Sequence, residues 1–428
     1  MKKKVITKPF DREKIPPRQN FFLTPLIWAL AKIATAPYKL KIKKVRMKGL
    51  KGPFIVFGTH MSFTDFMVTP LALFPRRANY ISELEGFENY GEWLYRQVGC
   101  LGTRKFVNDM SLIRNIKKVL ERNDILVLYP EARYANVGTF SKIPESVGKL
   151  VKMLGVPVVT INMKGNYLQS PIWNLKMRKG VRLEAEITQL FTADELAVLD
   201  ASEINSAIEE KLTYDEYAWQ FENKIKIDYK KRAEGIEKVL YQCPCCEKEF
   251  NMQTSGSKIS CKCCGVQWEM TEYGKMECLS DVLTANLNID FSHIPNWYEW
   301  QRSNVCHEID IEKYNLDIEV QIDSLPNAIN FIDLGIGRLK HNKNGYSLTF
   351  TEYGDKKPKT LTFSPLSMTS VHTECDYRGK GECITLSTTD NTYFIFPKGE
   401  GFNNVKIQFA TEYLYELNKA AIKNQCMA

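Results

Sequence analysis

The sequence lacks an uncharged apolar run long enough to cross a membrane. The run Phe21–Tyr38 contains Pro25 and is interrupted by Lys32, whereas a spanning helix needs about 20 apolar residues. Pro37 directly follows a small-residue stretch that resembles a secretory cleavage site, so no signal peptide is predicted. Long low-complexity tracts are absent too, and 428 residues with 44% hydrophobic content indicate a globular chain of two or three domains.

Acidic residues are scarce in the first 51 positions, which hold two of them beside fifteen Lys and Arg. The rest of the chain therefore carries a small net negative charge. Aromatic and apolar residues with dense lysine on both sides favour a helix that lies in a membrane interface and faces anionic headgroups. We predict that residues 1–51 are a basic, membrane-interface segment and place the protein on the cytoplasmic face of a membrane. The alternative is an ordinary N-terminal helix packed on its own domain.

The spacing of the cysteines does not suggest disulfide bonds. Six of the twelve cysteines fall into two clusters, each containing a C-x2-C pair. Four thiolates in two such pairs suit a tetrahedral Zn²⁺ with a structural role, because no coordination position stays open for a substrate. A reducing compartment follows. The expected ligands are Cys243, Cys246, Cys261 and Cys264, and whether Cys245 or Cys263 takes part stays open.

A zinc ribbon often contacts nucleic acid or protein. The ribbon and the region after it lack the basic excess with interleaved aromatics that a nucleic-acid surface requires. We therefore expect no nucleic-acid partner.

The order of patterns along the chain predicts the domains. Apolar runs alternate with amphipathic stretches over residues 52–202, which predicts a layered α/β domain. Residues 203–240 are rich in helix formers and predict a helical linker, and residues 241–270 form the ribbon. Residues 271–428 turn to short strand patterns, with an Asn344-Gly345 hairpin signal and a terminal amphipathic helix. The last domain is therefore expected to be β-rich and similar to a pleckstrin-homology-like fold.

Histidine is scarce, with five in the chain and only one before residue 290. That one, His60, follows the apolar run "GPFIVFG" and precedes Asp65 by five residues. A carboxylate that holds one imidazole nitrogen makes the other a general base for a hydroxyl group. The alternative is a helix cap or a core histidine.

Further polar residues follow other apolar runs. Arg104 and Lys105 come just after two glycines, and "LVLYPEARY" ends a run with Glu131 and Arg133. The ends of strands in an α/β layer are where ligands tend to bind. Pro157 lies in another apolar run, "GVPVVTI".

In order and spacing these stretches resemble the four blocks of the glycerolipid acyltransferase family, the type that acylates 1-acylglycerol 3-phosphate. "HMSFTD" matches the family's H-x4-D block at His60, Ser62 and Asp65, and the resemblance covers about residues 20–200. Two departures concern the blocks that bind the acceptor's phosphate in the family. Arg133 follows Glu131 by two residues where the family has three, and the block ending at Arg104 is a residue short.

The resemblance implies an acyltransferase that moves a fatty acyl group from acyl-CoA or acyl carrier protein to the hydroxyl of a lysophospholipid. His60 and Asp65 would be catalytic, no catalytic cofactor is expected, and the acceptor would be 1-acylglycerol 3-phosphate. Substrate-binding residues would be Ser62, Arg104, Lys105, Glu131 and Arg133. Two alternatives remain open: a different lipid acceptor, and a membrane-associated adaptor that works through its ribbon and C-terminal domain.

Overall fold

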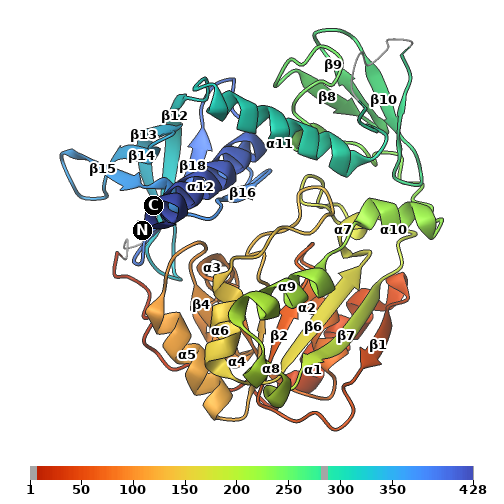
Figure 1. The fold of residues 1–428 in the computed structure, drawn as a ribbon, viewed down its shortest axis with the longest axis vertical. Helices are drawn as coiled ribbons and strands as arrows, with labels where there is room; N and C mark the ends of the chain where they lie inside the picture. The colour runs from red at the N-terminus through yellow and green to blue at the C-terminus, as the bar shows by residue number, and fades with distance from the viewer. Residues whose placement is uncertain (1–6, 281–287, 428) are drawn as a thin grey trace, which may run out of the picture.

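The computed structural model describes residues 7–280 and 288–427, which fold into two parts stacked on each other (Figure 1). The lower part contains a seven-stranded sheet between helices. The upper part contains the four-stranded sheet of the cysteine region and a second seven-stranded sheet.

The first sheet has the strand order β1-β7-β6-β2-β5-β3-β4, and all its neighbouring strands are parallel except β6 and β7. Every residue of the central strand β2 is buried, as expected for a parallel strand covered on both faces. The strands are β1 (Lys41–Val45), β2 (Phe54–Gly58), β3 (Ala78–Glu83), β4 (Cys100–Thr103), β5 (Ile125–Leu128), β6 (Val158–Lys164) and β7 (Glu184–Phe191).

Alternate residues of β2 face two hydrophobic cores. Phe54 and Val56 pack with helix α2 (Asp65–Leu73), on which α1 (Thr24–Thr35) lies, while Ile55 and Phe57 pack on the opposite face. That face is covered by α5 (Met110–Glu121), α6 (Ser146–Leu154) and α9 (Ala201–Leu212). The shorter helices are α3 (Leu84–Tyr90), α4 (Glu92–Gln97), α7 (Asn166–Gln169), α8 (Ala193–Val198) and α10 (Glu216–Glu222), with 3-10 turns η1 (Ala36–Tyr38) and η2 (Ile236–Lys238).

The layered α/β prediction is confirmed, although two segments differ from the expected division. Strand β1 pairs with β7, so part of the basic N-terminal segment belongs to this sheet. Helix α9 packs on α6 so closely that a Cβ at Gly148 would lie 2.0 Å from the Ala201 carbonyl oxygen. Part of the expected linker, helix α9, therefore belongs to the helical layer of this domain. The last α-helix of the expected linker ends at Glu222, and only the 3-10 turn η2 follows.

The cysteine region forms an antiparallel sheet in the order β11-β10-β9-β8. Its core residue Trp268 packs against Trp297 of α11 (Ile294–Asp310), and the two rings lie 5.5 Å apart. The sheet extends past residue 270, the expected end of the ribbon. Its strands are β8 (Met252–Ser255), β9 (Lys258–Cys261), β10 (Gln267–Met270) and β11 (Met276–Cys278).

The C-terminal sheet is antiparallel throughout, in the order β15-β14-β13-β12-β18-β17-β16. The expected hairpin joins β13 to β14, with Gly345 at a φ of 88°. A β-rich region closed by a terminal helix is confirmed, and the pleckstrin-homology-like analogy stays a prediction. The elements are β12 (Leu316–Leu325), β13 (Ile332–Asn342), β14 (Gly345–Thr351), β15 (Pro358–Phe363), η3 (Pro365–Ser367), β16 (His372–Glu374), β17 (Cys383–Ser387), β18 (Thr392–Pro397) and α12 (Asn404–Met427).

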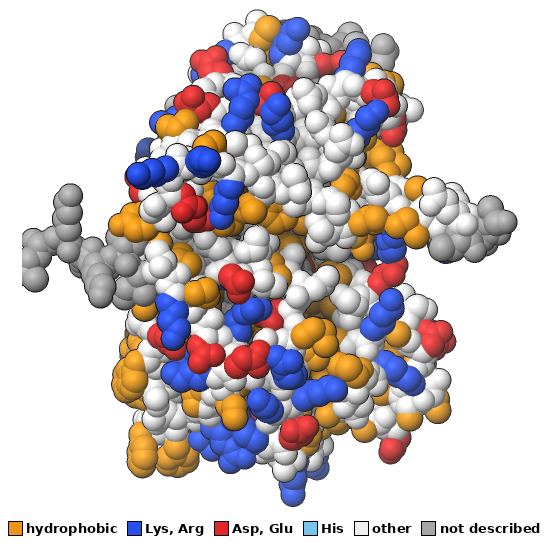
Figure 2. Space-filling model, turned by 90° about the vertical axis from the view of Figure 1, so that its left-hand side faces the viewer, with side chains coloured by type: hydrophobic (Ala, Val, Ile, Leu, Met, Phe, Trp, Pro, Cys, Tyr) orange, Lys and Arg blue, Asp and Glu red, His pale blue; other side chains and the backbone are white. Residues whose placement is uncertain are grey.

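The two parts share a hydrophobic core. One cluster of buried residues includes Tyr167 from the lower part, Trp297 from α11 and Phe409 from α12. Figure 2 shows hydrophobic side chains along the indented band where the two parts meet, with many Lys and Arg on the lower part. The two parts are therefore packed against each other through a shared hydrophobic core.

Within residues 7–280 and 288–427, no helix combines the length and the apolar character that a membrane crossing demands. Helix α1 is twelve residues long.

Candidate active site

His60 lies in the connection between the central strand β2 and helix α2. Strand β2 ends at Gly58, where a Cβ would come within 2.8 Å of the Tyr129 ring. Glycine therefore lets β2 and the segment after β5 approach each other. His60 itself is 6% exposed.

Asp65 is the first residue of α2 and is completely buried. Its Oδ2 lies 3.1 Å from His60 Nδ1 and accepts the backbone N–H groups of Met61 and Ser62 at 2.6 and 3.1 Å. Asn166 Nδ2 donates to Oδ1 at 2.7 Å. These donors hold the carboxylate in place, so it can orient the imidazole with Nε2 as the free nitrogen.

Aromatic rings enclose the imidazole. The Tyr129 ring stacks on it at 4.5 Å between centroids, and Tyr134 lies against it at 4.4 Å. Burial raises the pKa of both tyrosines well above the ordinary value, so both hydroxyl groups stay neutral. Aromatic rings therefore shield the imidazole from solvent, which strengthens its electrostatic contact with Asp65.

Glu131 connects His60 to the loop that follows β5. Its Oε1 accepts the backbone N–H of His60 at 3.0 Å, and its Oε2 accepts that of Ser141 at 2.9 Å. Burial raises the pKa of Glu131 to about 8. At neutral pH this carboxyl group is mostly protonated, and its contacts are to these two backbone N–H groups and, at 3.4 Å, to the Tyr214 hydroxyl group.

Arg133 is buried and reaches helix α12. Its Nη2 lies 2.9 Å from Glu412 Oε1 and donates to Ser141 Oγ at 3.2 Å. Its Nη1 is buried and has no hydrogen-bond partner among the described residues.

Arg104, the other expected phosphate ligand, is bonded to the C-terminal domain. It donates to the carbonyl oxygens of Leu325, Pro326 and Asp390 and to Thr392 Oγ1, at 2.8 to 3.0 Å. Burial lowers its pKa to about 10, which leaves it charged at neutral pH. The structure therefore places this guanidinium in an interface between domains.

Two further expected residues also have protein partners. Lys105 Nζ lies 2.5 Å from Glu83 Oε1 and 3.0 Å from Nδ1 of His372 on β16. Ser62 Oγ accepts the Thr64 backbone N–H at 3.3 Å, within the turn that leads into α2.

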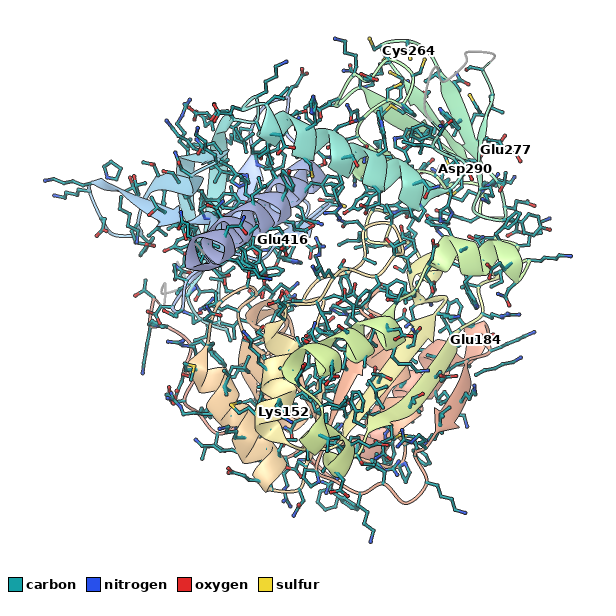
Figure 3. The ribbon with its side chains drawn as sticks, viewed as in Figure 1. Lys152, Glu184, Cys264, Glu277, Asp290 and Glu416 are labelled. Atoms are coloured by element: carbon teal, nitrogen blue, oxygen red, sulfur yellow. The ribbon has the colours of Figure 1, made fainter. Side chains whose placement is uncertain are left out.

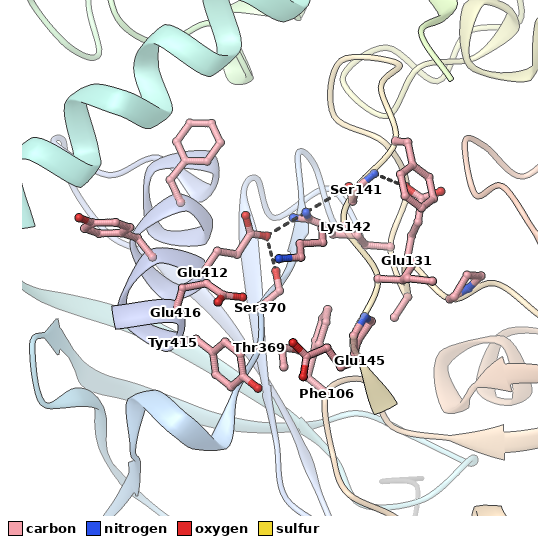
Figure 4. Close-up of a pocket in the computed structure, with 18 of the residues that line it drawn as sticks. Phe106, Glu131, Ser141, Lys142, Glu145, Thr369, Ser370, Glu412, Tyr415 and Glu416 are labelled. Atoms are coloured by element: carbon pink, nitrogen blue, oxygen red, sulfur yellow. Dashed lines mark hydrogen bonds and ion pairs between the residues drawn. The ribbon is translucent and has the colours of Figure 1, made fainter. Parts of the chain in front are cut away.

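A cavity of about 790 Å³ lies between the two parts, beside the loop that holds His60. Glu131 and Arg133 line one side, and α11, η3 and α12 provide the other (Figure 4). The His60 side chain is not in the wall of this cavity. The loop that lines the cavity nevertheless holds the His60 backbone at two points. Glu131 accepts the His60 N–H, and the Ala135 N–H donates to the His60 carbonyl oxygen at 3.1 Å.

The expected cysteine ligands come together. The Sγ atoms of Cys243, Cys246, Cys261 and Cys264 all lie within 4.8 Å of one another. The closest pairs are 3.6 and 3.7 Å apart, near the separation of about 3.8 Å that tetrahedral Zn–S bonds of ~2.3 Å require. This arrangement fits a zinc ribbon, and Cys245 and Cys263 lie outside it.

Several residues of the site were not identified from the sequence. Tyr129 and Tyr134 flank the "PEAR" stretch, and Asn166 follows the end of β6, so their positions at strand ends could have suggested them. Arg302, Ser370 and Glu412 lie far away in the sequence, in a region without a catalytic pattern. Only the fold brings them to Arg133.

A family model matches the part of the chain that contains the His60–Asp65 pair. Residues 38–164 match the acyltransferase family model, so this segment of the chain is an acyltransferase domain. The matched segment includes His60, Asp65, Arg104, Glu131 and Arg133.

One similar solved structure is the crystal structure of the 1-acyl-sn-glycerophosphate acyltransferase PlsC from Thermotoga maritima. It is 18% identical with a TM-score of 0.39, and the match covers 45% of this chain and 77% of that chain. No curated protein matches the chain.

Proposed function

We propose that this protein transfers a fatty acyl group from a thioester, acyl-CoA or acyl carrier protein, to the hydroxyl of a lysophospholipid. The observation that supports it most directly is the His60–Asp65 pair, whose carboxylate is held by three further hydrogen-bond donors inside an acyltransferase domain. The acceptor that the sequence resemblance names is 1-acylglycerol 3-phosphate.

The reaction needs no nucleophile from the protein. As the acceptor oxygen attacks the thioester carbonyl, its proton passes to His60 Nε2, while Asp65 stabilises the imidazolium through Nδ1. Collapse of the tetrahedral intermediate breaks the C–S bond, and the imidazolium returns the proton to the leaving thiolate. The products are a free thiol and a new ester.

A different lipid acceptor is a second candidate. Arg104 and Arg133, the expected phosphate ligands, are both engaged by residues of the C-terminal domain. A lipid with a different head group is therefore compatible with the same dyad.

We also propose that helix α1 brings the enzyme to a membrane surface. Phe22, Leu26, Leu30 and Ile33 are 55 to 86% exposed, at spacings that put Leu26, Leu30 and Ile33 on one helical face. Lysines on and after α1 would contact anionic headgroups, and the cytoplasmic face is the expected side. Sedimentation with vesicles containing anionic lipid would test this: Leu30→Asp should weaken binding, while Val198→Asp, at an even more exposed residue at the end of α8, should not.

The four cysteine thiolates would hold Zn²⁺ as a structural ion, since all four positions of a tetrahedron are filled by protein. It would stabilise the ribbon against α11. Catalysis by His60 does not require it.

Thiol release from acyl-CoA in the presence of lysophospholipid micelles tests the proposed function. Release should depend on the acceptor and fall at least about 10³-fold in His60→Ala. The matched control is His293→Ala, because His293 Nε2 lies 2.7 Å from Asp215 in a second His–Asp pair and should not affect turnover. Acceptor-dependent activity that survives His60→Ala would refute the mechanism and leave the adaptor alternative.

A further inference from the structure

The cavity beside Arg133 is not predominantly positive. Five cations and five carboxyl groups line it, and because Glu131 is mostly protonated at neutral pH the wall carries only about one net positive charge. A site built for a doubly charged phosphate would concentrate positive charge. The cations are Arg133, Lys142, Lys149, Arg302 and Lys419, and the carboxyl groups are Glu131, Glu145, Glu299, Glu412 and Glu416.

The carboxylate of Glu412 already lies between the two arginines. Its Oε1 contacts Arg133 at 2.9 Å and accepts from Ser370 Oγ at 2.7 Å, and its Oε2 contacts Arg302 at 2.5 Å. Arg302 also pairs with Glu299 at 2.9 Å. Burial alone would raise the pKa of Glu412, but the two guanidinium groups hold it below the ordinary value, so it is ionised.

Arg133 nevertheless keeps one donor for a ligand. Its side chain is 8% exposed, and Nη1 has no acceptor among the described residues. A buried N–H without an acceptor is costly, and an oxygen atom of a ligand in the cavity would satisfy it. Lys142 also extends toward Glu412 and Ser370 (Figure 4). Glu299 and Glu412 neutralise the charges of Arg133 and Arg302. Lys142 then gives this part of the cavity a net charge of about +1.

The cavity is also larger than a phosphate group needs. It continues from Arg133 along α12 to Lys419. Hydroxyl groups that suit a polar head group line it, from Ser146, Ser367, Thr369, Tyr413 and Tyr415.

We propose that the acceptor is a lysophospholipid whose phosphate is a diester, with the phosphate on Arg133 and the head group in this cavity. The inference rests on the proposed acyl transfer at His60. A diester carries a single negative charge, whereas a phosphate monoester carries about −1.5 to −2 at pH 7. Glu412 is then a specificity-determining residue, because its carboxylate repels the second charge.

The test compares kcat/KM for 1-acyl lysophosphatidylglycerol and 1-acylglycerol 3-phosphate with the same acyl chain, using the full chain. The wild-type enzyme should prefer the diester at least about tenfold. Glu412→Gln should reduce that preference at least about tenfold, mainly by improving use of the monoester. Glu210→Gln removes the same charge from an exposed side chain of α9, outside the cavity, and should leave the ratio within about twofold.

Turnover that requires His60 but favours the monoester in the wild-type enzyme would overturn this inference and leave the proposed function intact. An unchanged preference in a folded Glu412→Gln variant would overturn the role of Glu412. If that variant does not fold, the wild-type preference decides alone. Turnover of either acceptor that survives His60→Ala would contradict the proposed function itself.

Discussion

The histidine site and the cysteine site are both short sequence motifs, but they are completed in different ways. The four thiolates need only two turns from one ribbon, and Figure 3 shows Cys264 at the outer end of the upper part. The dyad also comes from one turn, yet its surroundings include the segment after β5, Asn166 and the C-terminal domain. The cysteine site is thus local, whereas the surroundings of the histidine site depend on the whole fold. Four predictions test this contrast.

The largest effect is expected for Asp65→Asn. The amide keeps the shape of the side chain but cannot accept the same hydrogen bonds and stabilise an imidazolium, so kcat should fall about 10³- to 10⁴-fold. Steady-state thiol release measures the loss, and near-ultraviolet circular dichroism checks the fold. Asp215→Asn, in the other His–Asp pair, is the control; an equal loss there would mean that the variants act through folding.

Cys261→Ser should act on the ribbon and leave the dyad in place. Loss of one thiolate should lower bound zinc from about one ion per chain, and amides of β8 to β10 should exchange faster with solvent. Cys263→Ser is the matched control, since Cys263 lies outside the cluster. Unchanged zinc content in Cys261→Ser would show that the cluster is not the metal site.

Arg104→Lys tests the interface between the parts. Lysine keeps the charge but cannot reproduce a planar fork that donates to three carbonyls and a hydroxyl. The free energy of unfolding should fall by about 2–3 kcal/mol, measured by denaturant titration. Arg338→Lys, an exposed arginine paired with Asp317, should change it by less than about 0.5 kcal/mol. Equal effects would mean that Arg104 does not join the two parts.

The last prediction concerns the pH dependence of folding stability. Glu216 is completely buried, and burial raises its pKa from 4.5 to about 8. Between these values the carboxyl group is ionised only in the unfolded chain, so stability is full below about pH 4.5 and falls as pH rises to about 8. Glu216→Gln, which cannot ionise, should reduce the fall in Tm between pH 5 and 8 by about 4 °C. If Tm falls with pH as steeply in Glu216→Gln as in the wild type, a group other than Glu216 causes the pH dependence.

The sequence predicted those features that depend on neighbouring residues. The i, i+4, i+7 pattern of Leu112, Ile116 and Val119 predicts a helix, and Asp109 caps it by accepting hydrogen bonds from the backbone N–H groups of Ser111 and Leu112. The C-x2-C pairs and the His60–Asp65 contact are equally local. Asn344-Gly345 fixed a hairpin because glycine takes the required positive φ.

Long-range pairing could not be predicted in the same way. β1 reads as part of a basic surface segment, since its charged residues are exposed, and only its pairing with β7 reveals a strand of the main sheet. Arg133 was expected to bind a phosphate, but no local pattern places Glu412 beside it. Glu412, 279 positions later in the sequence, pairs with Arg133 and so occupies one of the N–H donors that a phosphate would use.

The four bonds of Arg104 have a consequence for the order of synthesis. The strands of the acyltransferase sheet are all translated once Phe191 is made, but Arg104 precedes its partner Thr392 by 288 residues. At about 5–20 residues per second, this guanidinium waits roughly 15–60 s for the oxygens that will surround it. During that interval the nascent chain carries the His60–Asp65 motif without the C-terminal strands that bond to Arg104 in the folded protein.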